Sequence, residues 1–109
     1  MIKKYCLIIE VKQAHIEEYI KIHKQPWREM LEAIRDAGIT NEIIYFHKNQ
    51  SIIFMECEDF ELSNAKLRAT EICKKWDDKL VPWFEEVDIA FPEKIFDLNQ
   101  QLDGELLDN

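Results

Sequence analysis

Tyr19, His23 and Trp27 are spaced four residues apart, which places them along one side of a continuous α-helix. Histidine has an ordinary side-chain pKa of about 6.5, so it can hold or release a proton near neutral pH. A histidine between two aromatic side chains therefore suits general acid–base catalysis on a small bound molecule. The same spacing also describes a packed helix face with one hydrogen-bonded histidine, so spacing alone leaves both interpretations open.

The helix that carries these residues cannot run without interruption. It begins near Gln13, and Pro26 has no N–H and would clash with the carbonyl group of Ile22. The pattern predicts a break or kink at residues 24–26, followed by a second helical segment that ends before Gly38. Backbone groups freed at such a break need partners, and a ligand can supply them.

The remaining candidates are aromatic or acidic. Trp76 and Trp83 lie seven residues apart, hence roughly on one side of a helix. Trp83 suits core packing, whereas Trp76 is surrounded by charged residues. A tryptophan face beside a polar rim is a suitable platform for the C–H side of a sugar ring. We expect most of the carboxylates to lie on the solvated surface.

Composition excludes several classes of function. Two glycines cannot build the phosphate-binding loops of nucleotide-binding proteins. The net charge of −8, without a local Lys/Arg cluster, disfavours nucleic acids and anionic membranes as partners. Cys6, Cys57 and Cys73 lack metal-ligand spacing and suit buried, reduced thiols. No apolar stretch of about 18 residues and no leader is present, so we expect a cytoplasmic protein.

The order of elements predicts one α+β domain. Apolar runs typical of strands occupy residues 4–11, 41–47, 51–58 and 87–96, and helical periodicity occupies about 13–37 and 61–81, with a restart at Thr70 and a break at or just after Pro82. This β-α-β-β-α-β order favours a four-stranded antiparallel sheet with two helical regions on one face. A second copy of the chain is the natural cover for the other, apolar face. We expect residues 1–98 to form the domain and residues 99–109 an acidic tail.

At this point the sequence resembles the L-rhamnose mutarotase family. The features that carry the resemblance are Met1-Ile2-Lys3-Lys4, Ala14-His15-x-Glu17-Glu18-Tyr19-x-x-x-His23 with Trp27 four residues on, Ala37-Gly38, Asn41, Ile43-x-Tyr45, Phe54, Glu58 and Thr70-x-x-Cys73-x-x-Trp76. The resemblance implies a ferredoxin-like domain that pairs through its sheets into a dimeric α/β barrel. It also implies a cofactor-free enzyme that interconverts the α and β anomers of a monosaccharide.

The resemblance also implies site residues. His23 matches the family's proton donor, Tyr19 its sugar-contacting tyrosine, and Trp76 a wall of its sugar pocket. We expect Tyr19 and His23 to be catalytic, and Asn41 to bind a sugar hydroxyl group. No metal or cofactor is expected, because mutarotation needs only an acid and a base.

Two positions depart from the pattern of the rhamnose-specific members. Glu42 stands where they have a tyrosine, and Asp77 stands where they have the second residue of a Trp-Trp pair. Carboxylates prefer hydroxyl groups to the C6 methyl group of L-rhamnose. The expected substrate class is therefore an aldose such as L-rhamnose or L-fucose, with Glu42 and Asp77 either bound to the sugar or solvated.

Two other functions fit the same pattern. One is a different cofactor-free enzyme on this dimeric scaffold, such as a monooxygenase or a cyclase, because a fold does not determine its chemistry. The other is a non-catalytic module that binds a sugar or metabolite, in which His23 only forms a hydrogen bond.

Overall fold

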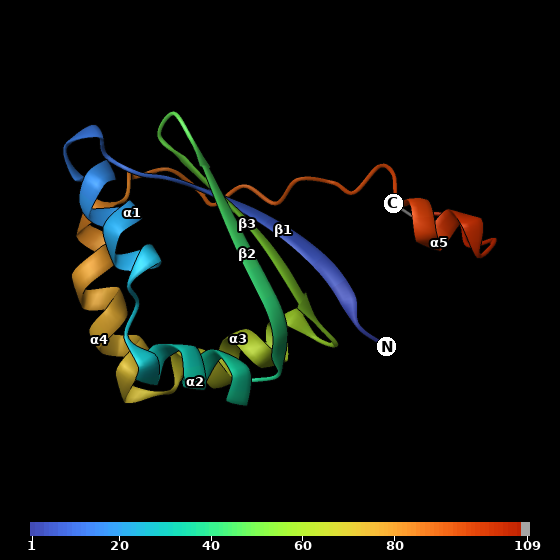
Figure 1. The fold of residues 1–109 in the computed structure, drawn as a ribbon, viewed down its shortest axis with the longest axis horizontal. Coiled ribbons are helices and arrows are strands. Elements are labelled where there is room, and N and C mark those ends of the chain that lie inside the picture. Colours follow the sequence, from blue (N-terminus) through green and yellow to red (C-terminus); the bar gives the residue numbers. More distant parts are fainter. Residues whose placement is uncertain (108–109) are drawn as a thin grey trace.

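The computed structural model describes residues 1–107, which form a twisted antiparallel sheet with all helices but the C-terminal one gathered on one side of it (Figure 1). The strands are β1 (Lys3–Glu10), β2 (Ile39–His47) and β3 (Gln50–Cys57), in the order β1-β3-β2. A tight turn joins β2 to β3, with Lys48 at a positive φ of 57°. This α+β arrangement agrees with the predicted class and with three of the four predicted strands.

Both predicted helical regions are split into two helices. The helices are η1 (Gln13–His15), α1 (Ile16–Lys24), α2 (Arg28–Asp36), α3 (Phe60–Arg68), α4 (Glu71–Leu80), η2 (Val81–Trp83) and α5 (Leu98–Leu102). The break between α1 and α2 contains Pro26, as predicted. The restart at α4 begins where Thr70 Oγ1 accepts a hydrogen bond of 3.2 Å from the backbone N–H of Cys73, which caps the new helix.

The two faces of the sheet differ in what covers them. On the helix-facing side, Leu7 and Ile53 pair across neighbouring strands and are buried. The opposite side exposes Ile43, Tyr45 and Phe54. A strand alternates its side chains between faces, so β2 and β3 contribute to both the core and this uncovered apolar surface.

The predicted fourth strand is absent from the sheet within the described residues. The segment that follows η2 runs beside β1, but it forms only two isolated bridges, Val11 with Phe84 and Ile8 with Ala90. Between the two bridges this segment advances six residues, from Phe84 to Ala90, whereas its partner spans only three, from Val11 back to Ile8, so it cannot keep a strand register. Pro92 then ends the pairing because it has no N–H to donate.

The C-terminal stretch contains one short helix. Residues 99–109 were expected to form an acidic tail, and most of helix α5 falls within residues 99–107. Asp97 caps this helix by accepting a 3.0 Å hydrogen bond from the backbone N–H of Gln100. Figure 1 shows α5 lying apart from the other helices. Residues 108 and 109 lie outside the described residues.

The core consists of two apolar clusters bridged by one tryptophan. The first contains Met30, Ala37, Ile39, Cys57, Leu67 and Cys73, and the second contains Val11, Tyr19, Leu80 and Trp83. Trp76 packs against both clusters. Cys57 and Cys73 are buried free thiols as predicted, whereas Cys6 is only half-buried.

The turn between α2 and β2 requires a glycine at position 38, which can be tested by substitution. Its φ of +100° strains any residue with a Cβ, and a Cβ there would lie 3.1 Å from Ser63 Oγ. We predict that Gly38→Ala lowers the free energy of unfolding by about 1–2 kcal/mol in urea titrations. The matched control is Gly104→Ala, at φ +85° with no atom within 4 Å and beside a helix that has no buried residue. Equal losses in the two variants would contradict this account.

Candidate functional site

His23 lies in the last turn of α1 with its two ring nitrogens in different roles. Nδ1 is 2.7 Å from the carbonyl oxygen of Tyr19. A carbonyl oxygen only accepts, so Nδ1 carries the proton, and in the neutral ring Nε2 carries none. Burial lowers the pKa of His23, an effect that the hydrogen bond to Tyr19 opposes. His23 is therefore neutral near pH 7, with a basic Nε2.

Tyr19 supports this histidine from within the core. The two rings pack with centroids 4.2 Å apart. The Tyr19 hydroxyl group lies 2.6 Å from Ser51 Oγ on β3, and the residue is 2% exposed. Burial raises the pKa of Tyr19 despite this hydrogen bond. The structure thus encloses the hydroxyl group that was predicted to be catalytic, and gives Tyr19 the position of a support for His23.

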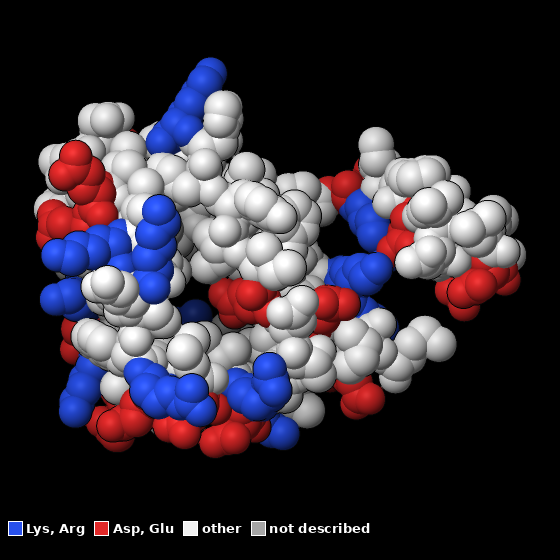
Figure 2. All heavy atoms as spheres, in the orientation of Figure 1, with Lys and Arg blue, Asp and Glu red and all other residues white. Residues whose placement is uncertain are grey.

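Two tryptophans complete an aromatic wall. Trp76 meets His23 edge to face with centroids 5.4 Å apart, and Trp27 meets Trp76 in the same way at 5.3 Å. Figure 2 shows a hollow in this face of the molecule, between α1 and the sheet and above α2, with a cationic group deep inside it and acidic atoms on the sheet side. The aromatic wall contains His23, the predicted acid–base residue, and Trp76, the predicted sugar platform.

Glu42 lies on the helix-facing side of β2. It pairs with Met55, which packs against the first core cluster, whereas the next residue, Ile43, points to the uncovered face. Burial raises the pKa of Glu42, and the positive charge of Arg68 opposes that rise. The Glu42 charge in turn helps to raise the pKa of Tyr19. Glu42 is therefore within electrostatic reach of both α1 and α3.

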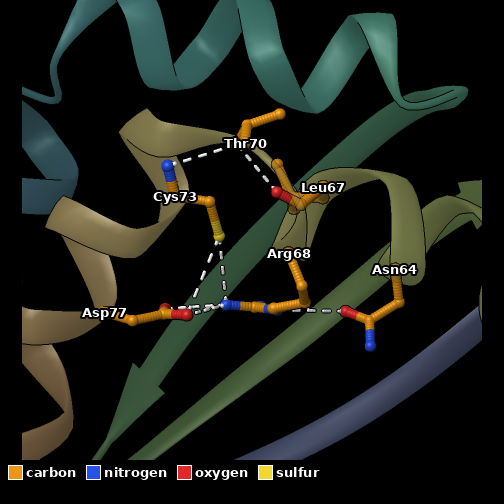
Figure 3. A network of polar contacts seen from close by, with 6 residues as sticks. All are labelled: Asn64, Leu67, Arg68, Thr70, Cys73 and Asp77. Carbon is orange, nitrogen blue, oxygen red and sulfur yellow. Dashed lines mark hydrogen bonds and ion pairs between the residues drawn. The ribbon is translucent and has the colours of Figure 1, made fainter.

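The Asp77 carboxylate forms an ion pair with Arg68, a residue that the sequence analysis missed. Arg68 Nη1 donates to both carboxylate oxygens of Asp77, at 2.7 and 2.6 Å, and its Nε donates to Asn64 Oδ1 at 3.3 Å. The buried Cys73 thiol donates to Asp77 Oδ2 at 3.8 Å, and its Sγ lies 3.2 Å from Arg68 Nη1 (Figure 3). Desolvation lowers the pKa of Arg68, but the bond and charge of Asp77 outweigh it, so the pKa is raised.

No sequence spacing could have linked Arg68 to Asp77. They belong to different helices, and the restart at Thr70 sets the angle that brings them together. A basic residue in the last turn of a helix is also the usual complement to the helix dipole. Arg68 therefore looked like an ordinary surface residue.

Asn41 is the one predicted site residue that the structure places elsewhere. Its Nδ2 donates to Glu56 Oε2 at 3.0 Å, on the sheet face that points away from the helices. The other predicted residues, together with Arg68, come from α1, α3, α4 and β2 around one region of the helix-facing side.

Neither a metal-binding cluster nor a membrane-spanning helix is found among the described residues. Among residues 1–107 no group of three or more histidine, cysteine, aspartate or glutamate side chains could hold a metal ion. Within the same part of the chain, no helix is both long and apolar enough to cross a bilayer.

The structure is thus a small α+β domain in which one histidine packs with two tryptophans on the helix-facing side. The L-rhamnose mutarotase family profile matches residues 4–102. An L-rhamnose mutarotase of Escherichia coli is 33% identical over 70% of this chain and 73% of its own length. The chain therefore belongs to the L-rhamnose mutarotase family, whose named members are isomerases acting on carbohydrates.

Coverage of other relatives is shorter. The L-rhamnose mutarotase of Lactiplantibacillus plantarum is 39% identical over 55% of this chain, and the alignment spans 59% of that relative. A counterpart from Listeria monocytogenes is 37% identical over 61% of this chain and 64% of its own length.

Solved structures support the α+β fold. An L-rhamnose mutarotase from Formosa agariphila superposes with a TM-score of 0.73 at 18% identity, over 88% of this chain and 98% of that one. An antibiotic biosynthesis monooxygenase gives a TM-score of 0.60 at 13% identity, over 87% of this chain and 99% of its own. At such identities the likeness concerns the fold alone.

The bond between Tyr19 and Ser51 makes a prediction about stability. Tyr19→Phe leaves the fully buried Ser51 hydroxyl group without its partner, which costs about 1–3 kcal/mol. In Tyr19→Phe/Ser51→Ala both groups are removed, so we expect the double variant to lose less than the sum of the single variants in urea unfolding. Strictly additive losses would show that the two hydroxyl groups do not interact.

Proposed function

We propose that this chain is a cofactor-free sugar mutarotase of the aldose 1-epimerase type, which interconverts the α and β anomers of a monosaccharide. The observation that carries the proposal is the state of His23. Its Nδ1 is fixed on the Tyr19 carbonyl group, and its Nε2 is left to exchange a proton with a ligand. Family membership supplies the substrate class, a sugar.

The reaction moves two protons and breaks one bond. The anomeric hydroxyl group loses its proton while the C1–O5 bond breaks, and the ring oxygen O5 gains a proton. Rotation about C1–C2 followed by the reverse steps closes the ring on the other face. We assign His23 as the acid–base group that serves O5. General acid–base catalysis supplies about 10²–10⁴-fold, which is enough for a reaction that is already moderately fast in water.

The other residues have binding roles in this proposal. Trp76 stacks on the C–H face of the sugar, and Tyr19 holds the His23 ring in place. Glu42 and Asp77 give the site acidic character that suits hydroxyl groups, with Asp77 acting through Arg68. Asn41 has no route to this site in one chain because it lies on the opposite face of the sheet. The sugar is an aldose such as L-rhamnose or L-fucose.

The proposal includes a homodimer formed through the uncovered sheet face. Ile43, Tyr45 and Phe54 are 47%, 62% and 45% exposed there, and contiguous apolar surface of this kind marks an interaction site. In the dimeric α/β barrel the segment around Ala90 would extend its pairing with β1 into the fourth strand.

The dimer makes a direct prediction. Phe54→Glu places a charge in the middle of the uncovered face, and we expect it to halve the mass measured by light scattering after gel filtration. Leu31→Glu is the matched control, because Leu31 is equally exposed at 45% but lies on α2. A monomeric wild type, or a Phe54→Glu variant with unchanged mass, would refute this interface.

Activity is measured by magnetisation-exchange NMR between the anomeric protons of several aldoses, including L-rhamnose and L-fucose. We expect purified protein to accelerate exchange for at least one sugar, and His23→Ala to lower that rate about 10²-fold or more. His15→Asn, which alters a histidine bonded to Glu18 at the start of α1, leaves the rate unchanged. Acceleration of none of the sugars would refute the mutarotase function; an unaltered His23→Ala rate would refute only the assigned mechanism.

A further inference from the structure

Mutarotation needs proton transfer at two oxygen atoms, and His23 can serve only one of them. Its Nδ1 is bound to the Tyr19 carbonyl oxygen at 2.7 Å, so Nε2 is its single reactive atom. If Nε2 serves O5, a second group must exchange a proton with the anomeric hydroxyl group.

The neighbouring polar groups are already engaged. The Tyr19 hydroxyl group is enclosed in the core on Ser51. The Asp77 carboxylate holds Arg68 through both oxygens. Cys73 is fully buried beside that pair, and an arginine stays protonated at any working pH. None of these groups is free to take a proton from a sugar.

Glu42 is the exception. No hydrogen bond or ion pair joins its carboxylate to another group within the described part of the chain, although the side chain lies on the helix-facing side of β2. The titratable groups that interact electrostatically with Glu42 are Tyr19 from α1 and Arg68 from α3, and Arg68 in turn contacts Asp77 and Cys73 of α4. Glu42 thus projects from the sheet toward the region that His23 and Trp76 border from the helices.

We propose that Glu42 is the second proton-transfer residue of this site and serves the anomeric hydroxyl group while His23 serves the ring oxygen. This inference rests on the mutarotase function proposed above. Ring opening starts from the form in which both nitrogens of His23 are protonated and Glu42 is ionised. The Glu42 carboxylate takes the O1 proton, the O1 electron pair forms C1=O, the C1–O5 bond breaks, and O5 takes the proton of His23 Nε2, which leaves His23 neutral and Glu42 protonated. Closure on the other face returns both protons, so nothing is consumed.

The surroundings of the two residues suit such a pair. Burial lowers the pKa of His23 and raises the pKa of Glu42, which brings the two values closer together. The active form holds one proton between the two residues. The rate must fall at low pH, where both are protonated, and at high pH, where neither is. Loss of Glu42 removes the low-pH limb, because that limb reports protonation of the carboxylate that takes the O1 proton.

The test compares Glu42→Gln with wild type over pH 4–9, using the sugar with the highest exchange rate. We expect Glu42→Gln to lower kcat by about 10²-fold or more with KM changed by less than about threefold, and to lose the low-pH limb. Glu42→Ala should regain rate when formate is added as a replacement carboxylate. The control is Glu56→Gln, one strand away on the opposite sheet face, where glutamine can still accept from Asn41.

The outcomes separate this inference from the function on which it rests. A wild type without activity on any sugar overturns the mutarotase function and this role together. An active wild type with a Glu42→Gln rate within threefold overturns only the role of Glu42. A loss confined to KM makes Glu42 a binding residue and overturns its part in proton transfer. Unchanged urea midpoints in the variants exclude misfolding as the cause of a loss.

Discussion

The hydrogen bond between His23 Nδ1 and the Tyr19 carbonyl oxygen is the constraint on which the rest of the site depends. It fixes the proton on Nδ1 and leaves Nε2 as the nitrogen to which we assign proton transfer. The bond lies within the last two turns of α1, whose end is set by Pro26. Tyr19 in turn is tied to β3 through Ser51. The position of the imidazole ring therefore follows from a helix end and one buried hydroxyl pair.

Charge on the helix-facing side is arranged around Arg68. Its ion pair with Asp77 is only partly exposed, with Arg68 and Asp77 side chains 49% and 34% accessible, so we assign it little stabilising free energy of its own. Its effect is positional, because the pair engages both oxygens of the Asp77 carboxylate and holds the positive charge of Arg68 close enough to Glu42 to oppose the rise in the pKa of that residue. A site with one occupied and one unoccupied carboxylate can both bind hydroxyl groups and move a proton.

The local pattern of the chain predicted most of the fold. Pro26 and Thr70 marked both helix breaks, and short apolar runs marked β1, β2 and β3. The prediction of a fourth strand was wrong, because an apolar run indicates strand propensity but not register. The segment near Ala90 does not stay in register with β1 and therefore forms only isolated bridges. The meeting of His23 and Trp76 was predicted only through the family resemblance. The Arg68–Asp77 pair was missed, because it depends on the angle between α3 and α4, which no sequence spacing encodes.

The central claim is that His23 keeps its Nδ1 proton on the Tyr19 carbonyl group and exchanges protons with a bound sugar through Nε2. Nitrogen-15 NMR of the histidine rings, recorded from pH 4 to 9 with and without sugar, tests it most directly. The account predicts the Nδ1–H tautomer at pH 7, a His23 pKa below the ordinary value of about 6.5, and a change in the Nε2 shift when sugar is added. A neutral ring with its proton on Nε2, a His23 pKa above the ordinary value, or an Nε2 signal that no sugar alters would contradict it.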